Sequence, residues 1–184
     1  MTLRELLTRN KERVVEKWRQ GIIDTYPADG RDFLQQQGDR FANPIGYVVH
    51  EETDQLFEHL VNDMDPEGTR VSLDKLIRIR AVQDFLPSEA VSFVLLLKPI
   101  VRELLAEEIK THALYDELQA TEDAIDRMQL MALDSYTLCR DRISEIKVND
   151  ARRSTAKLIE RLNARLAEGS TGNSCNNTDK DNDR

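Results

Sequence analysis

Apolar residues recur every three or four positions along most of this chain, which is the spacing of amphipathic helices. Thr2 and Glu5 form a capping-box pattern, and the apolar stripe after them predicts one long first helix that ends near residues 26–27. Residues 29–40 contain two glycines and three consecutive glutamines and lack such a stripe. We expect a connector there, with at most a short helix.

Polar residues and prolines predict where the next helices begin and end. Asn43 precedes a proline and is expected to cap a helix that the Asp-Pro-Glu-Gly sequence at 65–68 stops. Ser72 is expected to cap a shorter helix, which ends before Pro87 because a residue that precedes proline resists the helical conformation. Ser88 is expected to cap the helix that follows.

Residues 90–105 are apolar on nearly every side, which predicts the most buried helix of the fold. Pro99 removes one backbone hydrogen bond inside this segment, so we expect a kink over residues 95–98. Phe93 and Leu96 are the positions where alanine should be most damaging.

From Leu114 the chain has no glycine or proline until Gly169, which predicts one very long helix through Glu168. Apolar or small residues recur on it every seven positions and are expected to form the face of a dimer: Leu118, Ile125, Ala132, Cys139 and Ile146.

The last part of this helix carries a weaker apolar seam, which is the candidate output element: Val148, Ala151, Thr155, Leu158 and Leu162. We therefore divide the chain into a helical domain (1–150), a linker helix that can form a short coiled coil (151–168), and a polar tail (169–184). The tail has no apolar side chain except Cys175, so it is predicted to be disordered.

Composition agrees with an all-α protein, because only seven glycines and five prolines are available for turns. The chain has 34 acidic and 26 basic residues, a formal net charge of −8, which argues against nucleic acid or an anionic membrane surface as a partner. Charges interrupt the N-terminus where a signal peptide needs apolar residues, and the longest apolar run is too short to span a membrane. We expect a cytoplasmic protein.

The sequence contains no recognisable catalytic or metal-binding motif. No acidic residue stands three positions before His50, His59 or His112, so a di-iron site of the Glu-x-x-His kind is not predicted. The glycine-rich loops and serine elbows of common enzymes are also missing. We therefore expect no catalytic, metal or cofactor-binding residues and no enzyme activity. A haem-ligating histidine stays open, since counting residues does not test it.

Residues 77–85 place polar side chains among apolar ones on a helix that must pack. Arg78, Arg80 and Gln83, together with Tyr136 of the long helix, form the candidate ligand or interaction surface. Two interpretations stay open. Such groups satisfy helix ends and ion pairs in most proteins, and they line a ligand pocket in others.

Several segments together resemble a known family: residues 14–18 (Val-Val-Glu-Lys-Trp), 26–27, 41–45 (Phe-Ala-Asn-Pro-Ile), 79–83, 87–93, 125–126 and Tyr136. In order and spacing they are similar to the N-terminal sensory domain of the RsbR and RsbRD type of RsbT co-antagonists, the stressosome proteins of bacterial stress signalling. The resemblance covers roughly residues 3–153.

This resemblance implies a haem-free, globin-like helical bundle, usually dimeric, that acts upstream of a kinase or a phosphorylatable anti-sigma-antagonist domain. The linker helix runs here into the polar tail without such an effector. The expected function is therefore a non-enzymatic regulatory module, a homodimer that acts on a separate signalling protein. The alternative is a helical sensor that binds haem or a small ligand.

Overall fold

The computed structural model describes residues 1–27, 31, 34, 41–62, 64–83 and 85–172, with side chains through residue 165. Within these residues the chain forms helices and turns and contains no strand, which confirms the all-α class. It divides into two units, residues 1–140, called the body here, and residues 141 onward, whose helical part to residue 172 is called the linker segment. The globin-like character of the bundle stays a prediction.

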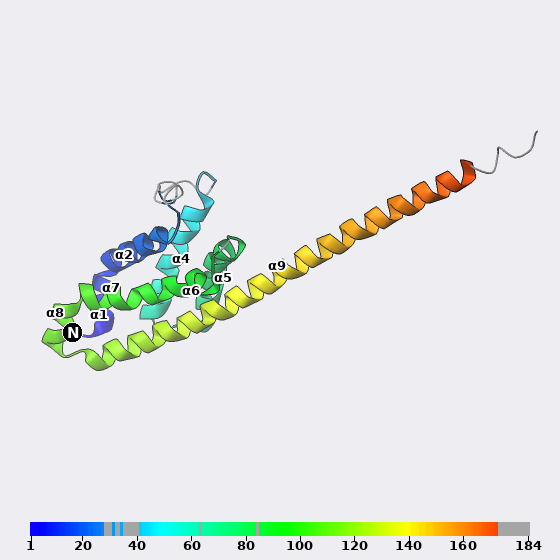
Figure 1. Cartoon of the computed structure of the whole chain (residues 1–184). Helices are drawn as coiled ribbons and strands as arrows, with labels where there is room; N and C mark the ends of the chain where they lie inside the picture. The colour runs from blue at the N-terminus through cyan, green and yellow to red at the C-terminus, as the bar shows by residue number, and fades with distance from the viewer. Residues whose placement is uncertain (28–30, 32–33, 35–40, 63, 84, 173–184) are drawn as a thin grey trace, which may run out of the picture. The chain divides into compact units, whose positions relative to one another are not determined.

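The described helices follow one another in the order drawn in Figure 1. They are α1 (Leu3–Arg9), α2 (Lys11–Asp24), α4 (Pro44–Val61), α5 (Pro66–Val82), α6 (Pro87–Val91), the 3₁₀ helix η1 (Ser92–Leu96), α7 (Leu97–Leu104), α8 (Ala106–His112) and α9 (Tyr115–Gly172).

The core of the body lies where α2 meets α4, η1 and α7. Trp18 of α2 is fully buried, and its indole N–H donates a hydrogen bond to the carbonyl of Phe93, with a nitrogen–oxygen distance of 2.7 Å. The two rings stack with centroids 6.4 Å apart. An indole that is buried in this way needs an acceptor, and the irregular backbone of η1 supplies one.

The first helix is not continuous, so the prediction of a single helix to residue 26 is wrong. Asn10 ends α1 and precedes α2, with backbone angles φ −102° and ψ 14°. Its side-chain amide donates to the carbonyl of Leu6 at 2.9 Å. Asparagine competes in this way for the hydrogen bonds of the helix backbone, which breaks a helix that its apolar stripe would otherwise continue.

Asn43 caps α4 as predicted, because its side chain accepts a hydrogen bond from Gly46. The helix after it, α5, begins at Pro66 and not near Ser72, which lies buried inside it. The Asp65 carboxylate accepts hydrogen bonds from the backbone of Glu67 and Gly68 at 3.2 and 3.1 Å. A capping acid before a proline therefore starts this helix. The prediction that this pair only ends the preceding helix was incomplete.

Ser88 does not cap the next helix. Leu86 occupies the capping position of α6, Pro87 is the first residue of the helix, and the Glu89 carboxylate accepts from the Leu86 N–H at 3.0 Å. The single helix predicted over 90–105 is not formed, because this segment consists of the end of α6, the 3₁₀ helix η1 and α7. The irregular part, η1, lies mostly before the kink predicted over residues 95–98. Phe93 is 1 % exposed, whereas Leu96 is only half-buried.

The first part of α9 packs on the body with the face that carries Ile125, Ala132 and Cys139, all of which are buried. Arg102 of α7 holds it with two hydrogen bonds to Glu122, at 2.5 and 2.6 Å, and Lys98 pairs with Asp126 at 2.7 Å. The prediction of a dimer interface is therefore wrong for Ile125, Ala132 and Cys139, because the chain's own helices cover them, whereas Leu118 is half-buried and Ile146 is exposed.

The long C-terminal helix is confirmed, and it continues to Gly172, past the predicted end at Glu168. Most of the predicted connector at 29–40 and the tail from residue 173 lie outside the described residues. No helix in the described part of the chain combines the length and apolar character needed to cross a membrane.

Phe93→Ala should lower the free energy of unfolding by roughly 3–5 kcal/mol, because it removes a buried ring that packs on Trp18. Urea denaturation of both proteins measures the loss. Leu95→Ala, at the neighbouring position that is 39 % exposed, is the control and should cost much less. Equal losses of unfolding free energy in the two variants would contradict the placement of Phe93 in the core.

Candidate functional site

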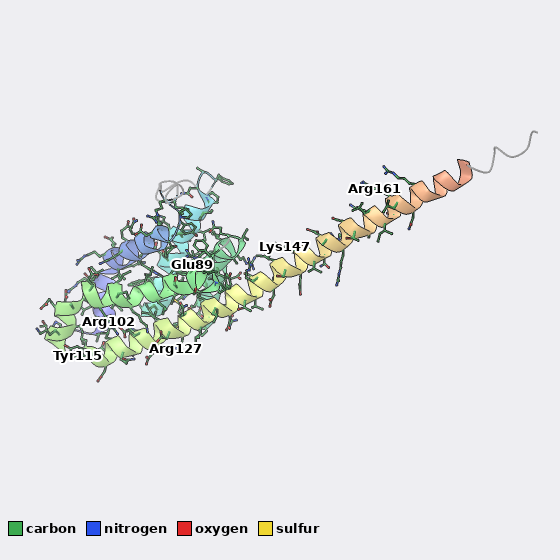
Figure 2. The ribbon with its side chains drawn as sticks, in the orientation of Figure 1. Glu89, Arg102, Tyr115, Arg127, Lys147 and Arg161 are labelled. Carbon is green, nitrogen blue, oxygen red and sulfur yellow. The ribbon has the colours of Figure 1, made fainter. Side chains whose placement is uncertain are left out.

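A cavity of about 770 Å³ opens at the end of the body where α2, the loop after α5, and α6 meet. Figure 2 labels Glu89, which lies on α6 at this place. The described residues that line the cavity are Thr25, Tyr26, Pro27, Gln83, Phe85, Glu89 and Ser92. Its volume falls within the range of roughly 300–1,000 Å³ that is usual for small-molecule sites.

Arg80, in the last turn of α5, lies directly behind the wall of this cavity and is 1 % exposed. Its Nη2 atom donates hydrogen bonds to the Thr25 hydroxyl and to the Glu89 carbonyl, both at 3.0 Å. The guanidinium also faces the rings of Tyr26 and Phe85. Four lining residues of the cavity therefore contact it: Thr25, Tyr26, Phe85 and Glu89.

Three aromatic rings surround the guanidinium carbon of Arg80. It lies 4.4 Å from the ring centroid of Phe85, 5.2 Å from that of Tyr26 and 5.6 Å from that of Phe93. Contact between a cation and these ring faces is attractive and partly replaces the water that the charge has lost. Arginine is suited to such stacking because its guanidinium is planar and weakly hydrated.

Some polar atoms at this place have no hydrogen-bond partner among the described residues: Nε and Nη1 of Arg80 and Oε1 of Gln83. Buried donors and acceptors of this kind are normally paired, so each needs an explanation. The site therefore offers unused hydrogen-bonding capacity next to a cavity.

Burial shifts the pKa of Arg80 and that of Tyr26 in opposite directions. It lowers the pKa of the Arg80 guanidinium, which Tyr26 and Glu89 partly offset. Burial raises the pKa of Tyr26, and the positive charge of Arg80 opposes that rise. Desolvation disfavours the charged form in both cases.

The loop beside the cavity also contacts α9. The Tyr136 hydroxyl donates to the carbonyl of Phe85 at 3.2 Å, and Arg140 Nη1 donates to the carbonyl of Ala81 at 3.1 Å. Phe85 therefore takes part in three arrangements at once: its ring covers Arg80, it lines the cavity, and its backbone holds α9. A displaced Phe85 would change all three.

Of the four residues predicted for a ligand or interaction surface, Gln83 lines the cavity, Arg80 lies behind its wall, and Tyr136 reaches this place only through the Phe85 carbonyl. Arg78 is not part of this arrangement. It is largely exposed and pairs with Asp74, one turn earlier on the same helix, at 2.7 Å. Two residues apart on a helix, Arg78 and Arg80 point to different sides.

Sequence reasoning missed the other residues of the cavity, above all Thr25, Tyr26 and Phe85. Tyr26 follows the end of α2 and precedes a proline, which is the only local signal that it occupies an unusual place. Nothing in the sequence indicates that it packs on a helix more than fifty residues later.

None of the three histidines is among the described lining residues of this cavity. Burial and the nearby Arg19 charge lower the pKa of His50, whereas the charges of Glu16 and Asp54 raise it. Over the described residues, no group of three or more His, Cys, Asp or Glu side chains is placed to hold a metal ion. Haem binding by this chain stays untested.

The output residues predicted from the sequence lie on the exposed linker segment, which Figure 2 marks with Lys147 and Arg161. Val148, Leu158 and Leu162 are 49, 60 and 54 % exposed, and Ala151 is also exposed.

Comparison with known proteins gives one match. The model of a protein family described as the RsbT co-antagonist protein rsbRD N-terminal domain matches residues 12–150. Neither a curated protein nor a solved structure matches the chain. The matched residues include the described lining of the cavity, Arg80 and the part of α9 that packs on the body.

The stability of the protein should fall as the pH rises above about 10, because burial raises the pKa of Tyr26 in the folded state. The unfolded chain then loses the tyrosine proton first, so alkali favours unfolding. Tyr26→Phe should remove this part of the decline in urea denaturation between pH 8 and pH 11. Tyr115→Phe, which changes a largely exposed tyrosine, should keep it. The same decline in all three proteins would contradict the burial of Tyr26.

Proposed function

The chain belongs to the family of the RsbT co-antagonist protein rsbRD N-terminal domain, and from this premise we propose that it is a non-enzymatic sensory module of bacterial stress signalling. The family itself implies a regulatory domain of stress signalling. In this proposal the body receives a signal in the cytoplasm, and the linker segment passes it to a separate signalling protein, such as a kinase or an anti-sigma-antagonist.

The observation that carries this proposal is the exposure of the linker segment. The described side chains from residue 144 to residue 165 are all exposed, although several are large and apolar: Ile146, Val148, Leu158, Ile159 and Leu162. A helix in water gains most of its stability from packing an apolar face. No described residue of this chain covers the apolar face of the linker segment. A protein partner would supply the missing contact.

We propose that a second copy of the chain is one such partner. Val148, Ala151, Thr155, Leu158 and Leu162 alternate at spacings of three and four, as in a coiled coil. Thr155 is polar and the seam is short, so pairing should be weak. A weak seam suits a signalling element, because a small change in the body then shifts the balance between paired and unpaired helices.

The contact between Tyr136 and Phe85 supports a route from the body to this helix. A signal that displaces the loop beside Arg80 would alter the hydrogen bond to Tyr136, at 3.2 Å, and the one from Arg140, at 3.1 Å. The linker segment follows directly after Arg140 in the same helix. The cavity also favours the second candidate function, a sensor that binds a small ligand.

Leu158→Asp combined with Leu162→Asp should abolish the dimer, because the two carboxylates would lie in the apolar seam. Sedimentation velocity over a concentration series measures the association. The melting temperature of the body should not change, since both leucines are exposed.

Ala156→Asp with Asn163→Asp is the matched control. It adds the same charge at exposed positions outside the seam, and this variant should dimerise like the parent protein. If the leucine variant formed dimers as stable as those of the parent protein, the role of this seam would be contradicted.

Tyr136→Phe should speed amide hydrogen exchange around residues 85–91 and in the adjoining part of α9, since it removes one hydrogen bond and little else. The expected loss is about 1 kcal/mol of stability. Mass spectrometry of the exchanged peptides measures the exchange rates, and Tyr115→Phe is the control. Unchanged exchange in both regions would argue against a route through Phe85.

A further inference from the structure

Arg80 carries a buried charge that makes no ion pair with a carboxylate in the described part of the chain, and the charge of Glu89 only partly offsets its loss of hydration. Its hydrogen bonds go to a hydroxyl and to a backbone carbonyl, and its other contacts are aromatic rings. Burial of a charge without a partner of opposite sign lowers stability. A feature that is costly in the free protein is a candidate for function.

The fold around Arg80 does not depend on its hydrogen bonds. The Thr25 hydroxyl also donates to the carbonyl of Ile22 at 2.6 Å, and the Glu89 carbonyl also accepts from the Ser92 hydroxyl at 3.1 Å. Both groups would keep a partner without the guanidinium. A purely structural role therefore leaves this arginine unexplained.

The cavity in front of Arg80 combines apolar walls with a few polar groups. Tyr26, Pro27 and Phe85 offer apolar surface, whereas Gln83, Thr25 and Ser92 offer amide and hydroxyl groups. This combination is typical of sites for small organic molecules. The guanidinium behind the wall repels a cationic ligand, and the Glu89 carboxylate on the wall offsets part of that repulsion.

One positive charge favours a ligand with one negative charge. The Glu89 carboxylate also lines the cavity and accepts a hydrogen bond from the Leu86 N–H at 3.0 Å. Its negative charge disfavours a multiply charged anion such as phosphate. A carboxylate accepts hydrogen bonds strongly from arginine, and an apolar body on the same molecule would fill the space between the rings.

We propose that this cavity binds a small organic monocarboxylate, with its apolar body against Tyr26 and Phe85 and its carboxylate hydrogen-bonded to Arg80. The inference rests on the proposed sensory function and names the class of ligand sensed. The guanidinium lies behind the lining residues, so the carboxylate reaches it when the half-buried Phe85 ring moves aside. That movement would also act on Tyr136, which holds the Phe85 carbonyl.

Phenylacetate and phenylacetamide are suitable probes, because they differ chiefly in charge. Titration calorimetry of the full chain should show saturable binding of phenylacetate and binding of phenylacetamide that is at least roughly tenfold weaker, as expected when a charge-assisted hydrogen bond is lost. Equal affinities for the two probes, or no binding of phenylacetate, would overturn the proposal. This comparison uses the parent protein alone, so it does not depend on how a variant folds.

Arg80→Met keeps an unbranched side chain and removes the charge. It should abolish the preference for phenylacetate and leave the melting temperature close to that of the parent, because removal of a buried charge offsets the loss of its two hydrogen bonds and ring contacts. Arg78→Met is the matched control, since it removes the same charge from an exposed position two residues away, and it should bind like the parent.

Retention of phenylacetate binding by Arg80→Met would also overturn the proposal. The dimerisation of the linker segment is measured separately, so a failure of this ligand class leaves the proposed output role open to its own test.

Discussion

The burial of the Arg80 charge is the constraint around which the residues at one end of the body are arranged. Its guanidinium contacts the end of α2 through Thr25 and Tyr26, the loop after α5 through Phe85, and α6 and η1 through Glu89 and Phe93. A single charged group thus contacts the end of α2 and three consecutive segments that come much later in the chain. The aromatic rings make its burial tolerable, and the space that they leave is the cavity.

The two parts of α9 use the same kind of sequence pattern in different ways. In the body, Ile125, Ala132 and Cys139 are buried against the chain itself, whereas Val148, Leu158 and Leu162 in the linker segment are exposed. A seven-residue repeat identifies a helix with an apolar face. It does not tell whether that face packs within the chain or on another molecule, because both environments remove the same apolar surface from water.

Helix type was predictable from the sequence, and helix ends were predictable only in part. The cap at Asn43 was found because asparagine before proline is a local signal. The break at Asn10 was not, since it depends on a side-chain hydrogen bond that overrides a continuous apolar stripe. For the site, Arg80 and Gln83 stood out as polar residues on a packing helix. Tyr26 and Phe85 did not, because only tertiary contact places them around the guanidinium.

Two features stay incomplete within the described residues: the Arg80 guanidinium, with Nε and Nη1 unpaired, and the exposed apolar face of the linker segment. A ligand or partner that binds either feature in the folded state would stabilise the protein by mass action. Phe85 and Tyr136 lie between them, joined by one hydrogen bond. A ligand that completes the first feature and moves Phe85 would therefore change the energy of α9, which is the thermodynamic condition for coupling between the two places.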